Sequence, residues 1–167
     1  VIVATGKGVK PERIGERVVV RTMMQNPKNN TPFSCWTMGS ECNGAFAQFT
    51  AVPSSEAFKI ECDWSDIELA SIPCAYSTAE NMLQRIGLSA ERVLINGASG
   101  GVGSAAIQLA KRRGAEIISI SRIKKADSLM SLGSTKVIDR EQDLVATIGS
   151  ENIDVVIDLV GGKSTSA

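Results

Sequence analysis

Histidine is absent from this 167-residue chain, and aromatic residues make up only 4% of it. The absence of histidine excludes a histidine base, a Ser-His-Asp triad and a histidine metal ligand within these residues. Neither sign of charge is in excess, because 18 lysines and arginines balance 18 aspartates and glutamates. This balance is not typical of a nucleic-acid surface or a polybasic membrane anchor. We therefore expect a small-molecule substrate, with no nucleic-acid partner and no membrane partner.

Long apolar runs are also missing, since no stretch approaches the roughly 18 residues that span a bilayer. The opening "VIVATGKGVKPERIGERVVV" lacks the charged start, apolar middle and small-residue cleavage site of a signal peptide. These absences predict a cytoplasmic protein. The chain opens on Val1 rather than Met, in what reads as the middle of a strand, and this predicts a fragment.

Cysteine is sparse, and its spacing is irregular. The four cysteines match neither a paired C-x-x-C zinc module nor a dense disulfide framework, so we expect mostly reduced thiols. They are Cys35, Cys42, Cys62 and Cys74.

The first part of the chain, residues 1–60, contains short segments of β-forming residues separated by turn formers. "VIVAT", "GERVVVRT" and "GAFAQFTAVP" are too short for helices and predict strands. Residues 23–43 hold two prolines and four asparagines without periodicity, which predicts a long loop.

The pattern becomes helical after residue 63. Ser65 or Asp66 can cap a first short helix, which Pro73 interrupts. A second helix is expected to end at Gly87. Its apolar stripe consists of Ala79, Met82, Leu83 and Ile86.

From residue 92 onward, strands and helices alternate regularly. Such alternation predicts right-handed crossovers and a parallel sheet covered by helices on both faces. "EIISI" and "DVVIDLV" are nearly all apolar, as expected for strands that are buried on both faces. We predict strands over 92–96, 116–120, 136–139 and 153–159, and helices over 101–113, 124–132 and 141–149.

Four glycines, Gly97, Gly100, Gly101 and Gly103, occupy the first strand-to-helix turn of this region. A pyrophosphate bound there would need free N–H groups at the helix start. It would also need no Cβ where the backbone approaches phosphate, and a small residue where the helix packs on the strand. The turn therefore predicts a nucleotide-binding site.

The stretch "NGASGGVGSAAIQLAKRRGA" resembles the A-x-x-G-G-V-G cofactor loop of the medium-chain dehydrogenase/reductase superfamily, which includes quinone oxidoreductases and zinc-type alcohol dehydrogenases. "RIGERVVV" and "GAFAQFTAVPSSEAFKI" resemble strands of its GroES-like domain, and "DVVIDLVGG" resembles its fourth cofactor-domain strand. The resemblance implies an α/β fold: a partial Rossmann parallel sheet with helices on both faces, preceded by part of a GroES-like β-barrel domain. The implied domains are 1–62 (GroES-like), 63–76 (connecting helices) and 77–167 (Rossmann).

The second predicted strand of the sheet ends in "ISISRIKKAD", which offers cations where an NAD site would have a carboxylate for the ribose hydroxyl. Positive charge suits a 2′-phosphate, so the sequence predicts NADP(H). The alternative is that "RIKK" is only a solvated helix start. The expected cofactor-binding residues are Thr78, Gly97, Ser99, Gly100, Gly101, Val102, Ser121, Arg122 and Lys125, with Lys124 nearby.

"PCAYSTAENML" resembles the segment that precedes the family's cofactor domain. The resemblance places Cys74 at a zinc-ligand position and Thr78 at the nicotinamide, while the other zinc ligands would lie upstream of Val1. The alternative for Cys74 is a buried small apolar residue. Relatives with a structural zinc carry four cysteines where this chain has only Cys35 and Cys42, so no structural zinc is expected.

The resemblance implies an NADPH-dependent oxidoreductase that transfers hydride to or from an alcohol or aldehyde, with zinc in the full-length protein left open. One alternative is a zinc-free quinone or enoyl reductase, and a second is a non-catalytic nucleotide-binding module. The resemblance also implies a homo-dimer or tetramer for the full-length protein. The sequence assigns no catalytic residue and leaves open whether the fragment itself turns over.

Overall fold

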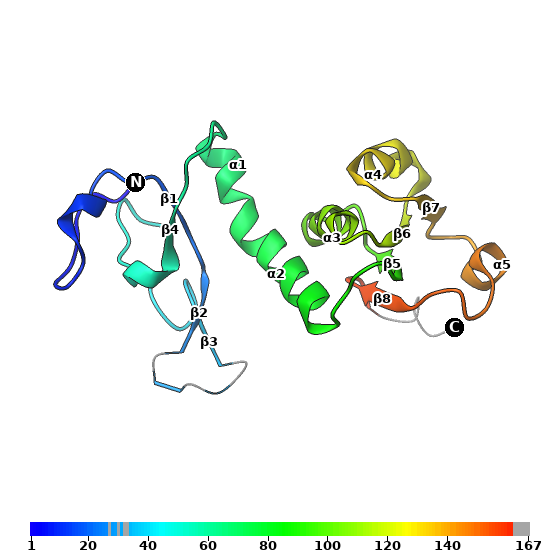
Figure 1. Cartoon of the computed structure of the whole chain (residues 1–167), viewed down its shortest axis with the longest axis horizontal. Coiled ribbons are helices and arrows are strands. Elements are labelled where there is room, and N and C mark those ends of the chain that lie inside the picture. The colour runs from blue at the N-terminus through cyan, green and yellow to red at the C-terminus, as the bar shows by residue number, and fades with distance from the viewer. Residues whose placement is uncertain (27, 30, 32–33, 162–167) are drawn as a thin grey trace. The chain divides into compact units, whose positions relative to one another are not determined.

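The computed structural model describes residues 1–26, 28–29, 31 and 34–161 of the chain (Figure 1). It divides the chain into two compact units, Val1–Pro73 and Cys74–Ala167. Across the described ranges, none of the helices combines the length and the apolar character that crossing a bilayer requires. The finer domain bounds 1–62, 63–76 and 77–167 stay a prediction.

The first unit contains two small antiparallel sheets. In one, β1 (Val18–Val20) pairs with β4 (Ala57–Lys59), and in the other β2 (Met23–Gln25) pairs with β3 (Cys35–Thr37). The prediction of one long loop over 23–43 is therefore wrong. Each strand is only three residues long, too short for alternation to be visible in the sequence. The first unit also contains two 3-10 turns, η1 (Pro11–Arg13) and η2 (Ser54–Glu56).

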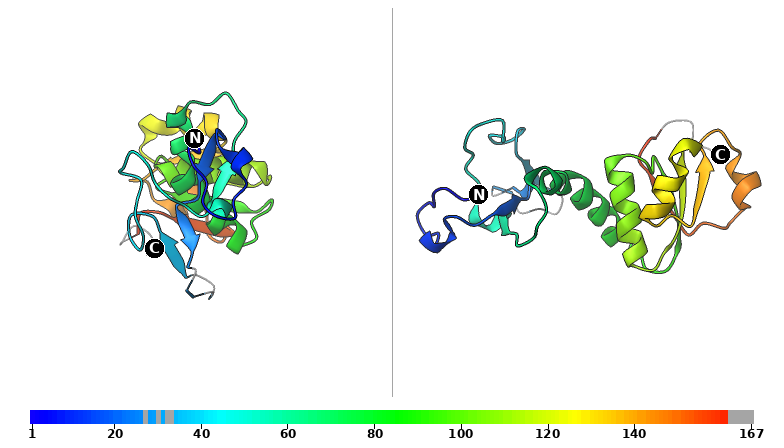
Figure 2. Two further views of the ribbon diagram at one scale, coloured as in Figure 1. Left: turned by 90° about the vertical axis from the view of Figure 1, so that its left-hand side faces the viewer. Right: turned by 90° about the horizontal axis from the view of Figure 1, so that it is seen from above.

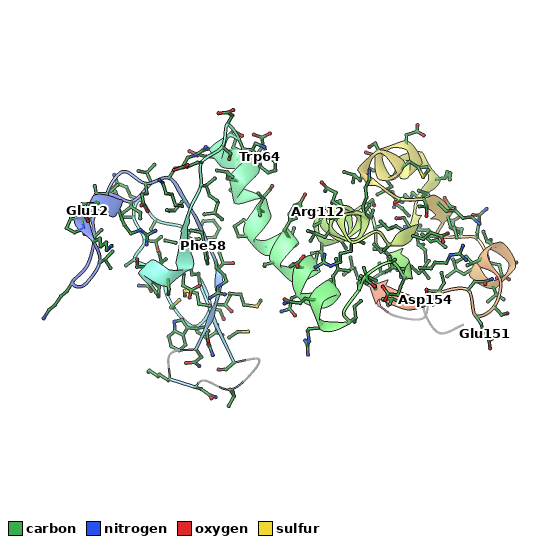
Figure 3. The ribbon with its side chains drawn as sticks, viewed as in Figure 1. Glu12, Phe58, Trp64, Arg112, Glu151 and Asp154 are labelled. Atoms are coloured by element: carbon green, nitrogen blue, oxygen red, sulfur yellow. The ribbon has the colours of Figure 1, made fainter. Side chains whose placement is uncertain are left out.

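The strands predicted in "VIVAT" and "GAFAQFTAVP" do not form, since no strand residue is assigned in either described stretch. Phe46 and Phe49 in the second stretch are exposed, as are Phe58 and Trp64 (Figure 3). β-forming residues adopt strands where they can pack on a neighbour, and these aromatic residues have little packing. The GroES-like barrel stays a prediction.

Two helices follow, as the sequence predicts. α1 (Asp66–Ala70) begins after Ser65, whose hydroxyl accepts from Glu68 N while the Glu68 side chain accepts from Ser65 N. This reciprocal pair is a capping box. α2 (Ile72–Arg85) has Pro73 in its first turn, where the missing N–H costs nothing, and Gly87 follows it with φ of 64°.

The second unit is built on a four-stranded parallel sheet in the order β7-β6-β5-β8. This confirms the predicted parallel sheet, and the order is that of one half of a dinucleotide-binding fold. The strands are β5 (Arg92–Asn96), β6 (Glu116–Ser121), β7 (Lys136–Asp139) and β8 (Val155–Asp158). The connections contain α3 (Gly101–Arg112), η3 (Ile123–Lys125), α4 (Ala126–Leu132) and α5 (Leu144–Ile148).

Helices lie on both faces of this sheet, as Figure 2 shows for α4 and α5 on opposite sides. One core contains residues of α2, α3 and α4 packed on the sheet, and a smaller core contains residues near α5. The prediction that β8 is buried on both faces is wrong, because Val156 is 56% exposed. Among the described strands β8 is the last in the sheet order, so its side chains gain cover from a described neighbouring strand on one side only.

Candidate functional site

The glycine turn between β5 and α3 is sterically demanding at two positions. Gly97 has φ of 77°, and a Cβ on it would lie 3.0 Å from Val160 Cγ2. A Cβ on Gly103 would lie 2.5 Å from the carbonyl oxygen of Gly97, which is fixed backbone. Gly97 therefore permits the left-handed turn, and Gly103 permits close packing of α3 on the strand end.

The start of α3 presents unused backbone donors. Gly100 is the N-cap residue in extended conformation, and no side chain of a described residue caps the helix. The first N–H groups of a helix, here those of Gly101, Val102 and Gly103, cannot bond within it. Together with the positive end of the helix dipole, they form a surface that suits a phosphate group.

A pocket of about 600 Å³ extends from this turn to the ends of β6 and β7. Its lining includes five of the nine cofactor residues predicted from the sequence: Gly97, Ser99, Ser121, Arg122 and Lys125. Gly100, Gly101 and Val102 lie beside it at the start of α3. Thr78 is outside this lining, on α2, where its hydroxyl donates to the carbonyl of Cys74 at 2.8 Å.

The basic rim of the pocket consists of Arg122, Lys124, Lys125 and Arg140, all exposed. In the part of the chain that the structure describes, the charged nitrogens of Arg122, Lys124 and Lys125 have no carboxylate oxygen within 4.0 Å. Arg140 Nη2 lies 3.9 Å from Glu141 Oε1. Sequence reasoning missed Arg140. The available signal was its position directly after the predicted strand 136–139, because β7 lies next to β6 and parallel strands end at one edge.

On the side of β5 away from β6, the neighbouring strand in the sheet is β8. The chain connections on the two sides of β5 therefore run to opposite faces of the sheet. Asn96 Nδ2 donates to Asp158 Oδ1 at 2.9 Å across these two strand ends. Asp158 also accepts from the backbone N–H of Val160. Ligands of open α/β sheets bind at such a switch point, which here adjoins the pocket.

The cysteines do not form a metal centre in the described residues. Cys35, Cys42, Cys62 and Cys74 are free thiols, and no three His, Cys, Asp or Glu side chains within 1–26, 28–29, 31 and 34–161 are grouped to hold a metal. Cys74 is exposed, so the alternative that it is a buried apolar residue is wrong. Its assignment as a zinc ligand stays a prediction.

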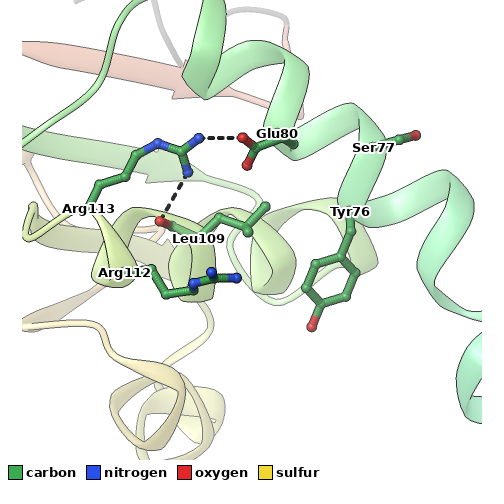
Figure 4. A pocket seen from close by; sticks show the side chains of 6 residues that line it. All are labelled: Tyr76, Ser77, Glu80, Leu109, Arg112 and Arg113. Carbon is green, nitrogen blue, oxygen red and sulfur yellow. Dashed lines mark hydrogen bonds and ion pairs between the residues drawn. The ribbon is translucent and has the colours of Figure 1, made fainter. Parts of the chain in front are cut away.

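A second pocket of about 610 Å³ lies between α2 and α3 (Figure 4). Arg113 Nη2 donates to Glu80 Oε1 at 2.5 Å, and Nη1 donates to the carbonyl of Leu109 at 3.2 Å. The Tyr76 hydroxyl accepts from Gln108 Nε2 at 2.8 Å. Arg112 also lines this pocket, which shares no lining residue with the first. Its charges are largely paired with each other.

Comparisons with known proteins agree with this geometry. A family model described as zinc-binding dehydrogenase matches residues 101–167. A protein from Sinorhizobium meliloti assigned as an alcohol dehydrogenase is 42% identical, with a TM-score of 0.88 over 98% of this chain and 47% of that one. Acryloyl-coenzyme A reductase from Metallosphaera sedula is 32% identical over 72% of this chain and 36% of its own length. The quinone oxidoreductase from Thermus thermophilus, also solved with NADPH, is 26% identical, with a TM-score of 0.62 over 68% of this chain and 39% of that one.

The sheet order and the glycine turn define a Rossmann-type unit of the kind found in dehydrogenases and reductases. The chain belongs to the medium-chain dehydrogenase/reductase superfamily, as the resemblance in its cofactor loop implies. It spans less than half the length of the three relatives described above.

Proposed function

We propose that this chain binds NADP(H), and that the whole protein is an NADPH-dependent oxidoreductase that transfers hydride to or from an alcohol or aldehyde. The observation that carries the proposal is the pocket in which the glycine turn and the four-cation rim meet. β6 ends at Ser121 and Arg122 follows it, so the position that would carry a carboxylate for a ribose 2′-hydroxyl carries a cation instead.

Each part of the pocket has a separate task in this proposal. The N–H groups of Gly101 and Val102 bind the pyrophosphate, and Gly97 permits the left-handed turn that precedes them. The Ser121 hydroxyl and the Arg122 guanidinium bind the 2′-phosphate through charge-assisted hydrogen bonds. Thr78 is the residue that contacts the nicotinamide. When bound, the cofactor supplies or accepts the hydride.

Zinc does not enter this chain's part of the proposal. The described residues offer no group of three suitable side chains, so we derive no step through a metal. The family name and the exposed thiol of Cys74 support a role for Cys74 as one ligand in the whole protein.

A zinc-free quinone or enoyl reductase is the second candidate, supported by the similarity to acryloyl-coenzyme A reductase and to a quinone oxidoreductase. A non-catalytic nucleotide-binding module is the third. Oxidation of NADPH by the full-length protein with a panel of aldehydes, quinones and activated alkenes separates the three. Turnover with one class selects the enzyme, and tight cofactor binding without turnover selects the module.

We also propose a cytoplasmic homo-dimer or tetramer that acts on a small molecule. The balance of 18 basic and 18 acidic residues supports a small-molecule partner. Sedimentation of the full-length protein tests the oligomeric state.

The cofactor proposal is tested by calorimetric titration of NADPH and of NADH into the chain. We expect tighter binding of NADPH, and a loss of about 10- to 100-fold for NADPH in Arg122→Ala, the effect of one charge-assisted hydrogen bond. Arg112→Ala is the matched control, because Arg112 is an exposed arginine that lines the other pocket. Equal affinity for the two cofactors in the unmodified chain contradicts the proposal.

A further inference from the structure

Arg122 and Arg140 lie on two separate segments, which must be held together if both cations are to reach one anion. Arg122 precedes η3, and Arg140 follows β7. Two hydrogen bonds between these segments involve the residues on either side of Arg122. Ser121 O accepts from Arg140 N at 3.1 Å, and Ile123 N donates to Asp139 Oδ2 at 2.8 Å.

Asp139 has both carboxylate oxygens engaged by backbone N–H groups. Besides the bond from Ile123, its Oδ1 accepts from Glu141 N at 3.0 Å. Its own N–H donates to Gln142 Oε1 at 3.2 Å, which folds this pocket-lining side chain back onto the turn. The carboxylate thus fixes the residue after Arg122 and the residue after Arg140.

An aspartate beside an anion site would ordinarily repel the anion. Here the N–H groups of Glu141 and Ile123 donate to the two carboxylate oxygens and hold the pKa of Asp139 below its usual value, so the carboxylate stays ionised with both oxygens bonded to the backbone. Asp139 is also absent from the lining of the pocket, whereas Arg140 next to it is present. The Asp139 carboxylate therefore fixes the backbone of the rim, while the charged side chains that the rim contributes to the pocket lining are cations.

We propose that Asp139 is the positioning residue of the 2′-phosphate site: its carboxylate joins the start of η3 to the end of β7 and so holds Arg122 and Arg140 on one anion. This inference rests on the proposed binding of NADP(H). It assigns Arg140 to that site as a second cation, and it makes discrimination between NADPH and NADH depend on a residue that touches neither cofactor.

Ile123→Pro tests the connection selectively, because proline removes the N–H that Asp139 accepts and leaves the carboxylate in place. Ile123 is the first residue of η3, a position that tolerates proline, and Arg122 before it has ψ of 136°, as a residue preceding proline requires. Ile123→Ala is the matched control, since it removes the side chain and keeps the N–H. Asp139→Asn removes the charge, and Asp154→Asn is its control: Asp154 Oδ2 accepts from Arg92 N at 2.8 Å, at the opposite edge of the sheet (Figure 3).

The readout is the dissociation constant of NADPH and of NADH, measured by calorimetry. We expect Ile123→Pro and Asp139→Asn to weaken NADPH binding about fivefold and NADH binding less than twofold, with both controls unchanged. If Asp139→Asn does not fold, Ile123→Pro decides. An equal loss for both cofactors overturns the inference, because Asp139 would then act on stability alone. An unchanged preference for NADPH in the variants also overturns the inference, while the proposed function then stands. A lack of preference in the unmodified chain overturns both.

Discussion

Different interactions stabilise the two units of this chain. In the second unit a contiguous apolar core packs on the sheet, with Ile95, Ile107 and Ile117 fully buried. In the first unit, the buried hydrophobic residues among those described are Met24, Ala57 and Leu69, while Phe46 and Phe49 are exposed. Burial of apolar surface therefore stabilises the second unit, whereas the first unit depends on other interactions for its stability.

Arginines supply much of the connection in the first unit. Arg13 donates to the carbonyls of Ser54 and Ala57, at 3.0 and 2.7 Å. Arg17 and Arg21 form ion pairs with Asp66 and Glu56, respectively. Because such polar contacts respond to pH and to the loss of one side chain, the two units are expected to respond to different perturbations. Both tryptophans, Trp36 and Trp64, lie in the first unit, so their fluorescence reports its unfolding separately.

The largest effect is expected from a cavity in the second unit. Ile107→Ala removes a fully buried side chain of α3, and we expect it to lower the free energy of unfolding by about 2–5 kcal/mol. Urea denaturation followed by circular dichroism measures this loss. Ile67→Ala is the control, because Ile67 is 85% exposed in the first unit. Similar losses for the two variants would contradict the comparison.

The next effect concerns the glycine turn. Gly103→Ala places a Cβ 2.5 Å from Gly97 O, and we expect a loss of about 1–3 kcal/mol from the resulting clash. Gly101→Ala is the control, because its nearest contact would be Ala75 Cβ at an ordinary 3.7 Å. Alanine also favours a helix over glycine by about 1 kcal/mol. A stable Gly103→Ala variant would show that α3 can move away from the strand end.

A smaller effect is expected from the ion pair of the first unit. Arg21 donates to both oxygens of the buried Glu56, at 2.6 and 3.0 Å, and this bond holds the pKa of Glu56 below its ordinary 4.5. Arg21 is half exposed, so we expect Arg21→Ala to cost only about 1 kcal/mol at neutral pH.

The pH dependence of this pair has a defined sign. The unfolded state binds the proton more readily, so the stabilisation is present above pH 4.5 and is lost as the pH falls through the lower folded pKa. In Arg21→Ala, tryptophan fluorescence should show a shallower loss of stability between about pH 5 and pH 3. An identical acid transition in both proteins would contradict this assignment.

The sequence was most informative where strands are buried. The predicted strand 92–96 matches β5 in both bounds, because a continuous buried apolar run between turn residues has few other folded arrangements. The predicted strand 136–139 also matches β7 in both bounds, although only Ile138 is buried there. The sequence was least informative over 23–43, where β2 and β3 are three residues long and only their pairing stabilises them.

The site divides in the same way. Glycines and cations that are local in the sequence, such as Gly97 and Arg122, could be predicted from one turn and one strand end. Arg140 could not, because its proximity depends on β7 lying beside β6. The role inferred for Asp139 depends on two hydrogen bonds that no spacing in the sequence reveals.

The smallest effects are expected from helix caps, of which each unit has one on a single-turn helix. Ser65 Oγ accepts from Glu68 N in the first unit, and Asp143 Oδ1 accepts from Ala146 N in the second. Replacing either by alanine is expected to cost about 0.5–2 kcal/mol. Because both apolar core clusters found among the described residues lie in the second unit, Ser65→Ala should shift the tryptophan fluorescence transition and Asp143→Ala should shift only circular dichroism. If Asp143→Ala also shifted the fluorescence transition, the two units would unfold as one, and the difference in their stabilising forces would have no consequence for their unfolding.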